Sequence, residues 1–301
     1  MTVTVFTPVY NRIDTIRRLY NSLESQTSKN FEWIVIDDGS TDGSFEELQR
    51  IQGAASFEIC VEKQTNKGKH AAINRGVLLA KGELFFIVDS DDYLRVDAIE
   101  TIHNLISTLP KNQKFAGIAG TKVNICGELV GTSFSESYVD CTALERKKHN
   151  INGDKSEVFF TEILRQFPFP VFEGENFLTE CVVWYRIANA GYMIRWTNEP
   201  IYICEYRNDG LSHTTGKCSR NFKGYQLYVK EVLGYKQISI WQRFMELLAY
   251  SAIAYKENKD LKACATQIEK PYIFIAIIGR VGFVAYKMKN YVLEKRWKYG
   301  K

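Results

Sequence analysis

Short apolar runs alternate with amphipathic segments along the first part of the chain. The apolar runs are Thr2–Thr7, Phe31–Ile36, Phe57–Val61 and Leu84–Val88. Helical spacing covers Asp14–Gln26, a stretch from Thr41 or Asp42 to Ile51, and Gly68–Ala80. This order is β-α-β-α-β-α-β, and continuous apolar strands between helices predict a parallel sheet that is covered on both faces.

The pattern is weaker after this point. We expect strands at Phe115–Gly120 and Ile201–Tyr206, a loop or hairpin at Glu128–Ser137, and helices at Val158–Phe167, Thr179–Ala190 and from Asn221 onward. Gly191 follows the second of these helices as a C-cap.

Polar clusters follow three of the predicted strands. They are Pro8–Arg12, Asp37–Ser40 and Asp89–Asp92. Ligands of open α/β sheets bind outside the carboxyl ends of the strands, so we expect the three clusters to meet at one edge. No GxGxxG follows the first strand, so the usual dinucleotide fingerprint is absent.

Aspartates in two of the clusters are suited to bind a ligand, one pair through a metal ion and the other through a hydrogen bond. The D-x-D spacing of Asp89 and Asp91 suits a hard divalent cation, Mg²⁺ or Mn²⁺, held between protein and phosphate oxygens. The alternative is a loop whose aspartates cap the next helix, near Val96. An aspartate in Asp37–Ser40 can accept a hydrogen bond from a ring N–H or a ribose hydroxyl; the alternative is again a helix cap, with Gly39 in the turn.

The composition of the chain excludes several classes of protein. Of 301 residues, 45% are hydrophobic and 25% charged, which excludes a disordered or collagen-like chain. A net charge of +4 is too small to indicate nucleic acid. The seven cysteines are spread singly, without a CxxC pair, so neither a disulfide framework nor a zinc knuckle is expected. A strand-like N-terminus and the lack of about 18 consecutive apolar residues favour a cytoplasmic protein without a span.

An ordered set of four motifs resembles family 2 glycosyltransferases. They are Thr7–Arg12, Val35–Asp42, Asn66–Glu83 and Val88–Asp92. The resemblance is strong over residues 1–100 and weaker over 165–215. It implies the GT-A fold: a Rossmann-like mixed α/β sheet with helices on both faces, here with a helical C-terminal extension. It also implies a nucleotide-sugar donor and an inverting transfer. We expect a catalytic domain at 1–215, with a donor half (1–100) and an acceptor half (101–215), and a helical region at 216–301.

The resemblance assigns roles to individual residues. Pro8 and Tyr10 would line the base pocket, Asp38 would meet the base, Asp89 would lie near the ribose and sugar, and Asp91 would bind the Mn²⁺ or Mg²⁺ ion. The other residues expected to bind the nucleotide sugar are Arg12, Asn66, Gly68, Lys69, Asn74 and Ser90. His213 would complete the metal shell, and an exposed loop histidine is the alternative.

Inverting transfer also needs a general base for the acceptor hydroxyl. Glu173, Glu175 and Glu180 are the candidates. Many family members read Gly-Glu-Asp here, whereas this chain has Asn176 at the third position, and an amide cannot act as a base. Glu180, with Arg186 and Gly191 after it, keeps the family's spacing. Glu180 is therefore the expected base and Glu175 the second choice.

The C-terminal sequence consists of an apolar segment followed by a basic one. Pro271–Tyr286 is apolar apart from Arg280, and six basic residues follow with only Glu294 opposing them. An apolar helix with a basic tail is typical of an element that docks on an anionic membrane. The alternative is a helix that packs on the catalytic domain or on a second subunit.

The leading interpretation is a metal-assisted glycosyltransferase. It would move a sugar, UDP-linked by expectation, to a glycan or a lipid-linked glycan. One alternative is a polyprenyl-phosphate sugar synthase, whose acceptor is already ionised. A second is a non-catalytic protein that binds sugar nucleotides, which Asn176 keeps open.

Overall fold

The apolar runs of the N-terminal part form neighbouring strands of one mixed sheet. The computed structural model describes residues 1–205 and 216–284. The sheet order is β3-β2-β1-β4-β9-β6-β10-β5, with β7 beside β6 and β8 beside β10. The strands are β1 Val3–Val9, β2 Phe31–Asp37, β3 Ile59–Lys63, β4 Leu84–Ile87, β5 Tyr93–Leu94, β6 Phe115–Asn124, β7 Leu129–Val130, β8 Tyr138–Cys141, β9 Lys155–Phe160 and β10 Met193–Cys204.

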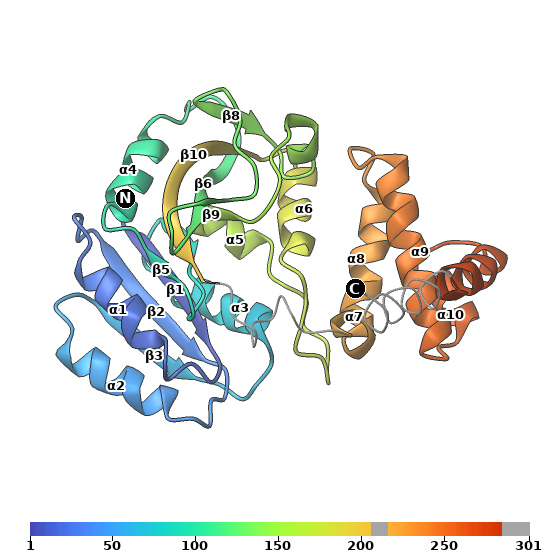
Figure 1. Ribbon diagram of the computed structural model, residues 1–301, viewed down its shortest axis with the longest axis horizontal. Coiled ribbons are helices and arrows are strands. Elements are labelled where there is room, and N and C mark those ends of the chain that lie inside the picture. The colour runs from blue at the N-terminus through green and yellow to red at the C-terminus, as the bar shows by residue number, and fades with distance from the viewer. Residues whose placement is uncertain (206–215, 285–301) are drawn as a thin grey trace, which may run out of the picture. The chain divides into compact units, whose positions relative to one another are not determined.

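Strands β1 to β4 are parallel, as the sequence predicts, because each is joined to the next by a helix. Strand β9 runs antiparallel to both β4 and β6, while β10 is parallel to β6. The sheet is therefore mixed, as the GT-A resemblance implies, and the carboxyl ends of β1, β2, β4, β6 and β10 share one edge (Figure 1).

Helices cover both faces of this sheet (Figure 1). The helices of this part are α1 Ile16–Glu24, α2 Ser44–Ala54, α3 Lys69–Leu79, α4 Ala98–Ser107, α5 Thr161–Gln166, α6 Cys181–Asn189 and the 3-10 helix η1 Arg146–His149. Apolar residues of α1, α2 and α4 share a core with Val3 and Val5 of β1. Phe6 points to the other face, where it lies against Gly76 of α3 with no room for a Cβ. The alternation along β1 thus fixes which helix lies on which face.

Two expectations need correction. Val158–Phe167 is not one helix: its first part completes strand β9, and the helix begins only at Thr161. Val158 and Phe159 are fully buried, and a short apolar run that is buried on both sides does not distinguish a strand from a helix. The strand expected at Ile201 begins at Met193, with an irregular register near Pro200; Tyr206 lies outside the described residues.

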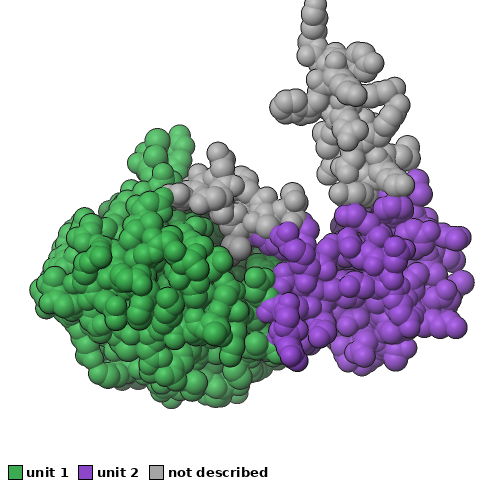
Figure 2. All heavy atoms as spheres, turned by 90° about the horizontal axis from the view of Figure 1, so that it is seen from below, with its two compact units in different colours: residues 1–171, 176–214 green, residues 172–175, 215–301 purple. Residues whose placement is uncertain are grey.

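The chain divides into two compact units (Figure 2). Unit 1 comprises residues 1–171 and 176–214, and unit 2 comprises residues 172–175 and 215–301. The helices of unit 2 are α7 Lys217–Arg220, α8 Phe222–Gly234, α9 Ile240–Lys256 and α10 Leu261–Gln267, and residues 272–284 are also helical. Ser239 and Asp260 cap α9 and α10 with their side-chain oxygens. No described helix is long and apolar enough to cross a membrane.

Candidate active site at the carboxyl edge of the sheet

The polar clusters that follow β1, β2 and β4 lie together at one edge of the sheet, as predicted. Direct bonds join them. The Asn11 amide donates to Oγ of Ser40 (2.9 Å), and Oγ1 of Thr15 donates to the carbonyl of Ser90 (2.8 Å). Asn11 adopts a left-handed conformation (φ 52°), which asparagine tolerates better than most residues. Hydrogen bonds therefore join the turns of this edge to one another.

Asp38 organises the middle of this edge. Its carboxylate accepts hydrogen bonds from Nε2 of Gln64 (2.7 Å) and from the backbone amides of Lys67 and Gly68 (both 2.8 Å). The Asp38 side chain is almost fully buried. A carboxylate has about four acceptor positions, so three bonds leave one for a ligand donor such as a base N–H.

The start of helix α3 is held from two sides. Asp38 binds the Gly68 amide, and the backbone carbonyl of Asn176 covers the Gly68 Cα so closely that an added Cβ would lie 1.9 Å from its oxygen. Gly68 has a φ of 87° and a ψ of 160°, a region open essentially only to glycine. Two segments far apart in the sequence therefore fix the first residue of α3, Lys69.

Lys69 joins two of the predicted site residues. Its Nζ lies 2.6 Å from Oδ1 of Asp89 and 2.9 Å from Oε1 of Glu180. The structure thus brings the expected base to the carboxylate that follows β4. Burial opposes ionisation of both groups. The Lys69 ammonium nevertheless keeps the pKa of Glu180 below its ordinary value, and Lys69 together with Lys122 and Arg12 does the same for the pKa of Asp89.

The Asp89–Asp92 turn is negatively charged and held from strand β10. The buried hydroxyl of Tyr202 donates to Oδ2 of Asp92 (2.8 Å) and accepts from the Asp89 amide (3.0 Å). Burial and the Asp89 charge raise the pKa of Asp91, and they raise the pKa of Asp92 to about 6. Nη2 of Arg12 lies 3.6 Å from Oδ2 of Asp91.

A divalent cation fits the donors of this turn. Asp89 and Asp91 offer hard oxygen ligands, and their mutual repulsion would fall if a cation lay between them. Among the described residues, no three His, Cys, Asp or Glu side chains are grouped to hold a metal. Protein ligands would then supply only part of the shell, as is usual for Mg²⁺ bound with substrate phosphates. The expected ligand His213 lies outside the described residues.

Glu175 is engaged elsewhere. Its two carboxylate oxygens accept from the backbone amides of Lys223 (2.7 Å) and Gly224 (2.8 Å) at the start of α8. These amides have no partner within the helix, and the carboxylate also meets the positive end of the helix dipole. This contact explains Glu175 as a helix cap and leaves Glu180 as the glutamate beside Asp89.

The remaining expected residues make different kinds of contact. Both amide atoms of Asn74 bind the backbone of Phe169 (2.8 Å each), so this side chain ties α3 to the loop after α5. The Asn66 backbone lies against Gly39. Tyr10 is half exposed beyond the end of β1, and Pro8 is paired with Ile36 of β2.

Two residues of this site were not identified from the sequence. Tyr202 sets the turn described above, and Nη2 of Arg18 donates to the carbonyl of Asp91 (2.5 Å) while Arg18 also pairs with Glu205. Neither residue belongs to a motif. A buried tyrosine in an apolar strand was the available signal, since a buried hydroxyl needs a partner.

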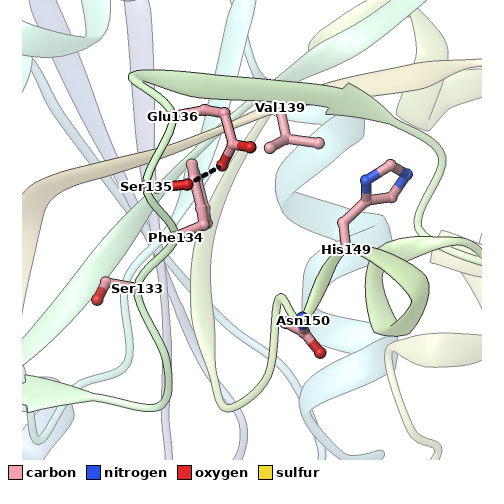
Figure 3. A pocket seen from close by; sticks show the side chains of 7 residues that line it. All are labelled: Ser133, Phe134, Ser135, Glu136, Val139, His149 and Asn150. Carbon is pink, nitrogen blue, oxygen red and sulfur yellow. Dashed lines mark hydrogen bonds between the residues drawn. The ribbon is translucent and has the colours of Figure 1, made fainter.

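A separate cavity of about 310 Å³ lies in unit 1 (Figure 3). It is formed by the segment before β8 and by the end of η1. Its lining residues are Ser133, Phe134, Ser135, Glu136, Val139, His149 and Asn150. Ser135 donates to Glu136 (3.0 Å). None of the expected site residues lines it.

Comparisons with known proteins place the chain among glycosyltransferases by sequence similarity. Residues 4–125 match the model of glycosyl transferase family 2. Glycosyltransferase GlyA of Streptococcus pneumoniae is 38% identical over 104 residues, which are 35% of this chain and 15% of GlyA. The Escherichia coli protein named UDP-Glc:alpha-D-GlcNAc-diphosphoundecaprenol beta-1,3-glucosyltransferase WfaP is 28% identical over 65% of this chain and 74% of its own length.

Two solved structures show the same fold. Staphylococcus aureus TarS 1–349 in complex with UDP-GlcNAc superposes with a TM-score of 0.62 at 20% identity, over 85% of this chain and 73% of that one. The mannosyltransferase PcManGT of Pyrobaculum calidifontis, in complex with GDP-Man and Mn²⁺, gives a TM-score of 0.50 at 16% identity, over 95% and 75% of the two chains. The fold is therefore that of the GT-A glycosyltransferases, and this chain spans about a sixth of the length of GlyA.

Proposed function

We propose that this chain transfers a sugar from a UDP-sugar to a hydroxyl of a glycan or lipid-linked glycan, with inversion at the anomeric carbon. The match of residues 4–125 to the model of glycosyl transferase family 2 supports this activity. The donor occupies the edge formed by the turns after β1, β2 and β4. Residues 1–100 bind the donor, and residues 101–215 receive the acceptor.

One observation carries this proposal. Asp89 and Glu180 share the Lys69 ammonium, at 2.6 Å and 2.9 Å. One oxygen of each carboxylate therefore lies within hydrogen-bond distance of the same nitrogen. An inverting transfer needs a donor site and a proton acceptor close together. The proximity of the turn after β4 and the start of α6 supports a donor site and a proton acceptor at adjacent positions.

The reaction is a single displacement. The acceptor oxygen forms a bond to the anomeric carbon while the bond from that carbon to the phosphate oxygen breaks. The electron pair leaves with UDP, and the hydroxyl proton moves to Oε of Glu180. Asp38 and Tyr10 hold the base, and Asp89 orients the ribose and sugar.

Asp91, with Asp89 beside it, is the proposed ligand for Mn²⁺ or Mg²⁺. When bound, such an ion offsets charge on the leaving diphosphate. Arg12 lies 3.6 Å from Asp91, and its guanidinium is well placed to exchange that partner for a phosphate oxygen.

The UDP nucleotide and the acceptor class are taken from relatives. TarS 1–349 is in complex with UDP-GlcNAc, and the name of WfaP gives a UDP-glucose donor and an acceptor linked to diphosphoundecaprenol. The edge described here has the parts that such a donor needs, which supports the same class for this chain.

A donor screen tests the proposal. We expect one UDP-sugar, with Mn²⁺ present, to raise the melting temperature, because a ligand at ~100 times its Kd adds about 2.7 kcal/mol to the free energy of unfolding. The same sample should then release UDP when acceptor is supplied. GDP-sugars and EDTA-treated samples are the controls. A chain that shifts with no UDP-, GDP- or dTDP-sugar contradicts the proposal, and binding without UDP release supports a non-catalytic protein.

We also propose that unit 2 contacts an anionic membrane surface. In helix 272–284, Gly279 and Gly282 lie against α9: an added Cβ would lie 2.7 Å from the Ser251 carbonyl oxygen at Gly279 and 3.0 Å from the Ala252 Cβ at Gly282. The opposite face carries Ile273, Ile277, Val281 and Val284, each more than half exposed. This spacing forms one apolar stripe, and the basic sequence of residues 287–301 follows it.

Vesicle flotation tests this contact. We expect the full chain to float with phosphatidylglycerol vesicles and to float less with phosphatidylcholine vesicles or at high salt, because both changes weaken the attraction of lysines to the lipid. The double variant Ile277→Asp and Val281→Asp should lose most of the floating fraction. Leu78→Asp is the matched control, since Leu78 is an exposed apolar residue of unit 1. Equal flotation of the two variants would contradict the assignment.

A further inference from the structure

We propose that Lys69 is a positioning residue for the transfer: it holds the Glu180 carboxylate in place beside Asp89 and acts on turnover through Glu180. This inference rests on the proposed function. The motif resemblance placed Lys69 with the residues expected to bind the nucleotide sugar. The structure instead places its ammonium between two carboxylates, at 2.6 Å and 2.9 Å.

The backbone of Lys69 is fixed before its side chain makes these contacts. Gly68, the residue before it, is bound by Asp38 and covered by the Asn176 carbonyl. Lys69 is the first residue of α3, which is anchored further along by the contact of Gly76 with Phe6. The ammonium therefore reaches Asp89 and Glu180 from a rigid base, which limits where both carboxylates can lie.

Electrostatics give the bridge its importance. Asp89 and Glu180 are each about one third exposed, and Lys69 is 24% exposed. Two carboxylates this close repel each other where water screens them only partly. Each lowers the stability of the other's charged form, and Lys69 reverses the effect, which is why the pKa of Glu180 lies below its ordinary value. Without the ammonium, Glu180 would be free to turn away from Asp89.

The geometry also limits how many hydrogen bonds Lys69 can donate to the sugar nucleotide. An ammonium has three N–H donors, and the two contacts use two of them. Most of the interaction of Lys69 is thus committed to protein carboxylates. This arrangement predicts a large effect of Lys69 on turnover and a small effect on nucleotide affinity.

The test separates these two effects. For Lys69→Met we expect the kcat of UDP release, with the donor found in the screen, to fall by about 100-fold, as for a misplaced catalytic group. The Kd for UDP with Mn²⁺, measured by calorimetry, should stay within about threefold. Lys69→Arg should recover most of the lost kcat, because the guanidinium keeps the charge and can contact both carboxylates. Lys111→Met, which removes an exposed lysine from the turn before β6, is the matched control and should leave both constants unchanged.

A second pair of variants guards against a folding defect. In the Glu180→Gln background, adding Lys69→Met should lower kcat by less than about threefold, because residues that act as a unit are not additive. Three results would overturn the inference: an unchanged kcat in Lys69→Met, a loss of UDP affinity as large as the loss of kcat, or full additivity with Glu180→Gln. Failure of the proposed function is distinguishable, since the wild-type chain itself would then release no UDP.

Discussion

Replacing Glu180 with glutamine is expected to lower the kcat of sugar transfer by about 10²–10⁴-fold, the usual contribution of a general base. Glutamine keeps the size of the side chain but cannot accept a proton from the acceptor hydroxyl. Donor affinity should change little, because Lys69 keeps its contact with Asp89 (2.6 Å) and the turns that bind the nucleotide are untouched. Steady-state kinetics and calorimetry with UDP measure the two quantities.

Glu175→Gln is the matched control for this experiment. The two glutamates undergo the same chemical change, but Glu175 binds the first amides of α8 and Glu180 binds Lys69. We expect Glu175→Gln to retain most of its kcat and to lose about 1 kcal/mol of stability, as for other helix caps. If instead Glu175→Gln abolishes turnover and Glu180→Gln does not, the role of base passes to Glu175.

Gly68→Ala is expected to reduce the free energy of unfolding by about 3–5 kcal/mol, from backbone strain and overpacking together. The added Cβ would lie 1.9 Å from the carbonyl oxygen of Asn176, which is far inside contact distance. The backbone there also has a φ of 87° and a ψ of 160°, which alanine does not adopt. UDP affinity should fall as well, because the Gly68 amide donates a hydrogen bond to Asp38, the residue that we propose holds the base.

Gly43→Ala provides the comparison. Gly43 precedes α2 as Gly68 precedes α3, and its φ is 92°, but nothing lies within 4 Å of an added Cβ. Alanine there should lose only about 1–2 kcal/mol, the cost of a left-handed conformation. Urea unfolding of both variants, with unchanged m values, measures the difference. Equal losses would mean that the Asn176 carbonyl moves away from Gly68 at no cost.

The meeting of the three polar clusters at one edge of the sheet was predictable from sequence because each cluster is a local feature of the chain. Each polar cluster directly follows an apolar strand, and parallel strands bring such ends together. The four strands and three helices of this part were confirmed to within a few residues at their ends. The helix that begins after Glu180 was also confirmed, as Cys181–Asn189.

The rest depended on contacts that no local pattern encodes. Val158 and Phe159 have the same apolar character in a strand as in a helix, and only pairing with β4 and β6 decides between them. The cap that Glu175 provides and the bridge that Lys69 makes both join segments far apart in the sequence. The motif could therefore place Lys69 at the site but not name its partners.

The hydroxyl group of Tyr202 joins strand β10 to the Asp89–Asp92 turn, because it binds both the Asp89 amide and the Asp92 carboxylate. Because that strand also lies in the half that we propose receives the acceptor, the two proposed substrate sites share a structural support. Efforts to redirect acceptor choice by randomising this strand would therefore disturb the sugar nucleotide too. Libraries that hold Tyr202 constant would let one specificity be changed without the other.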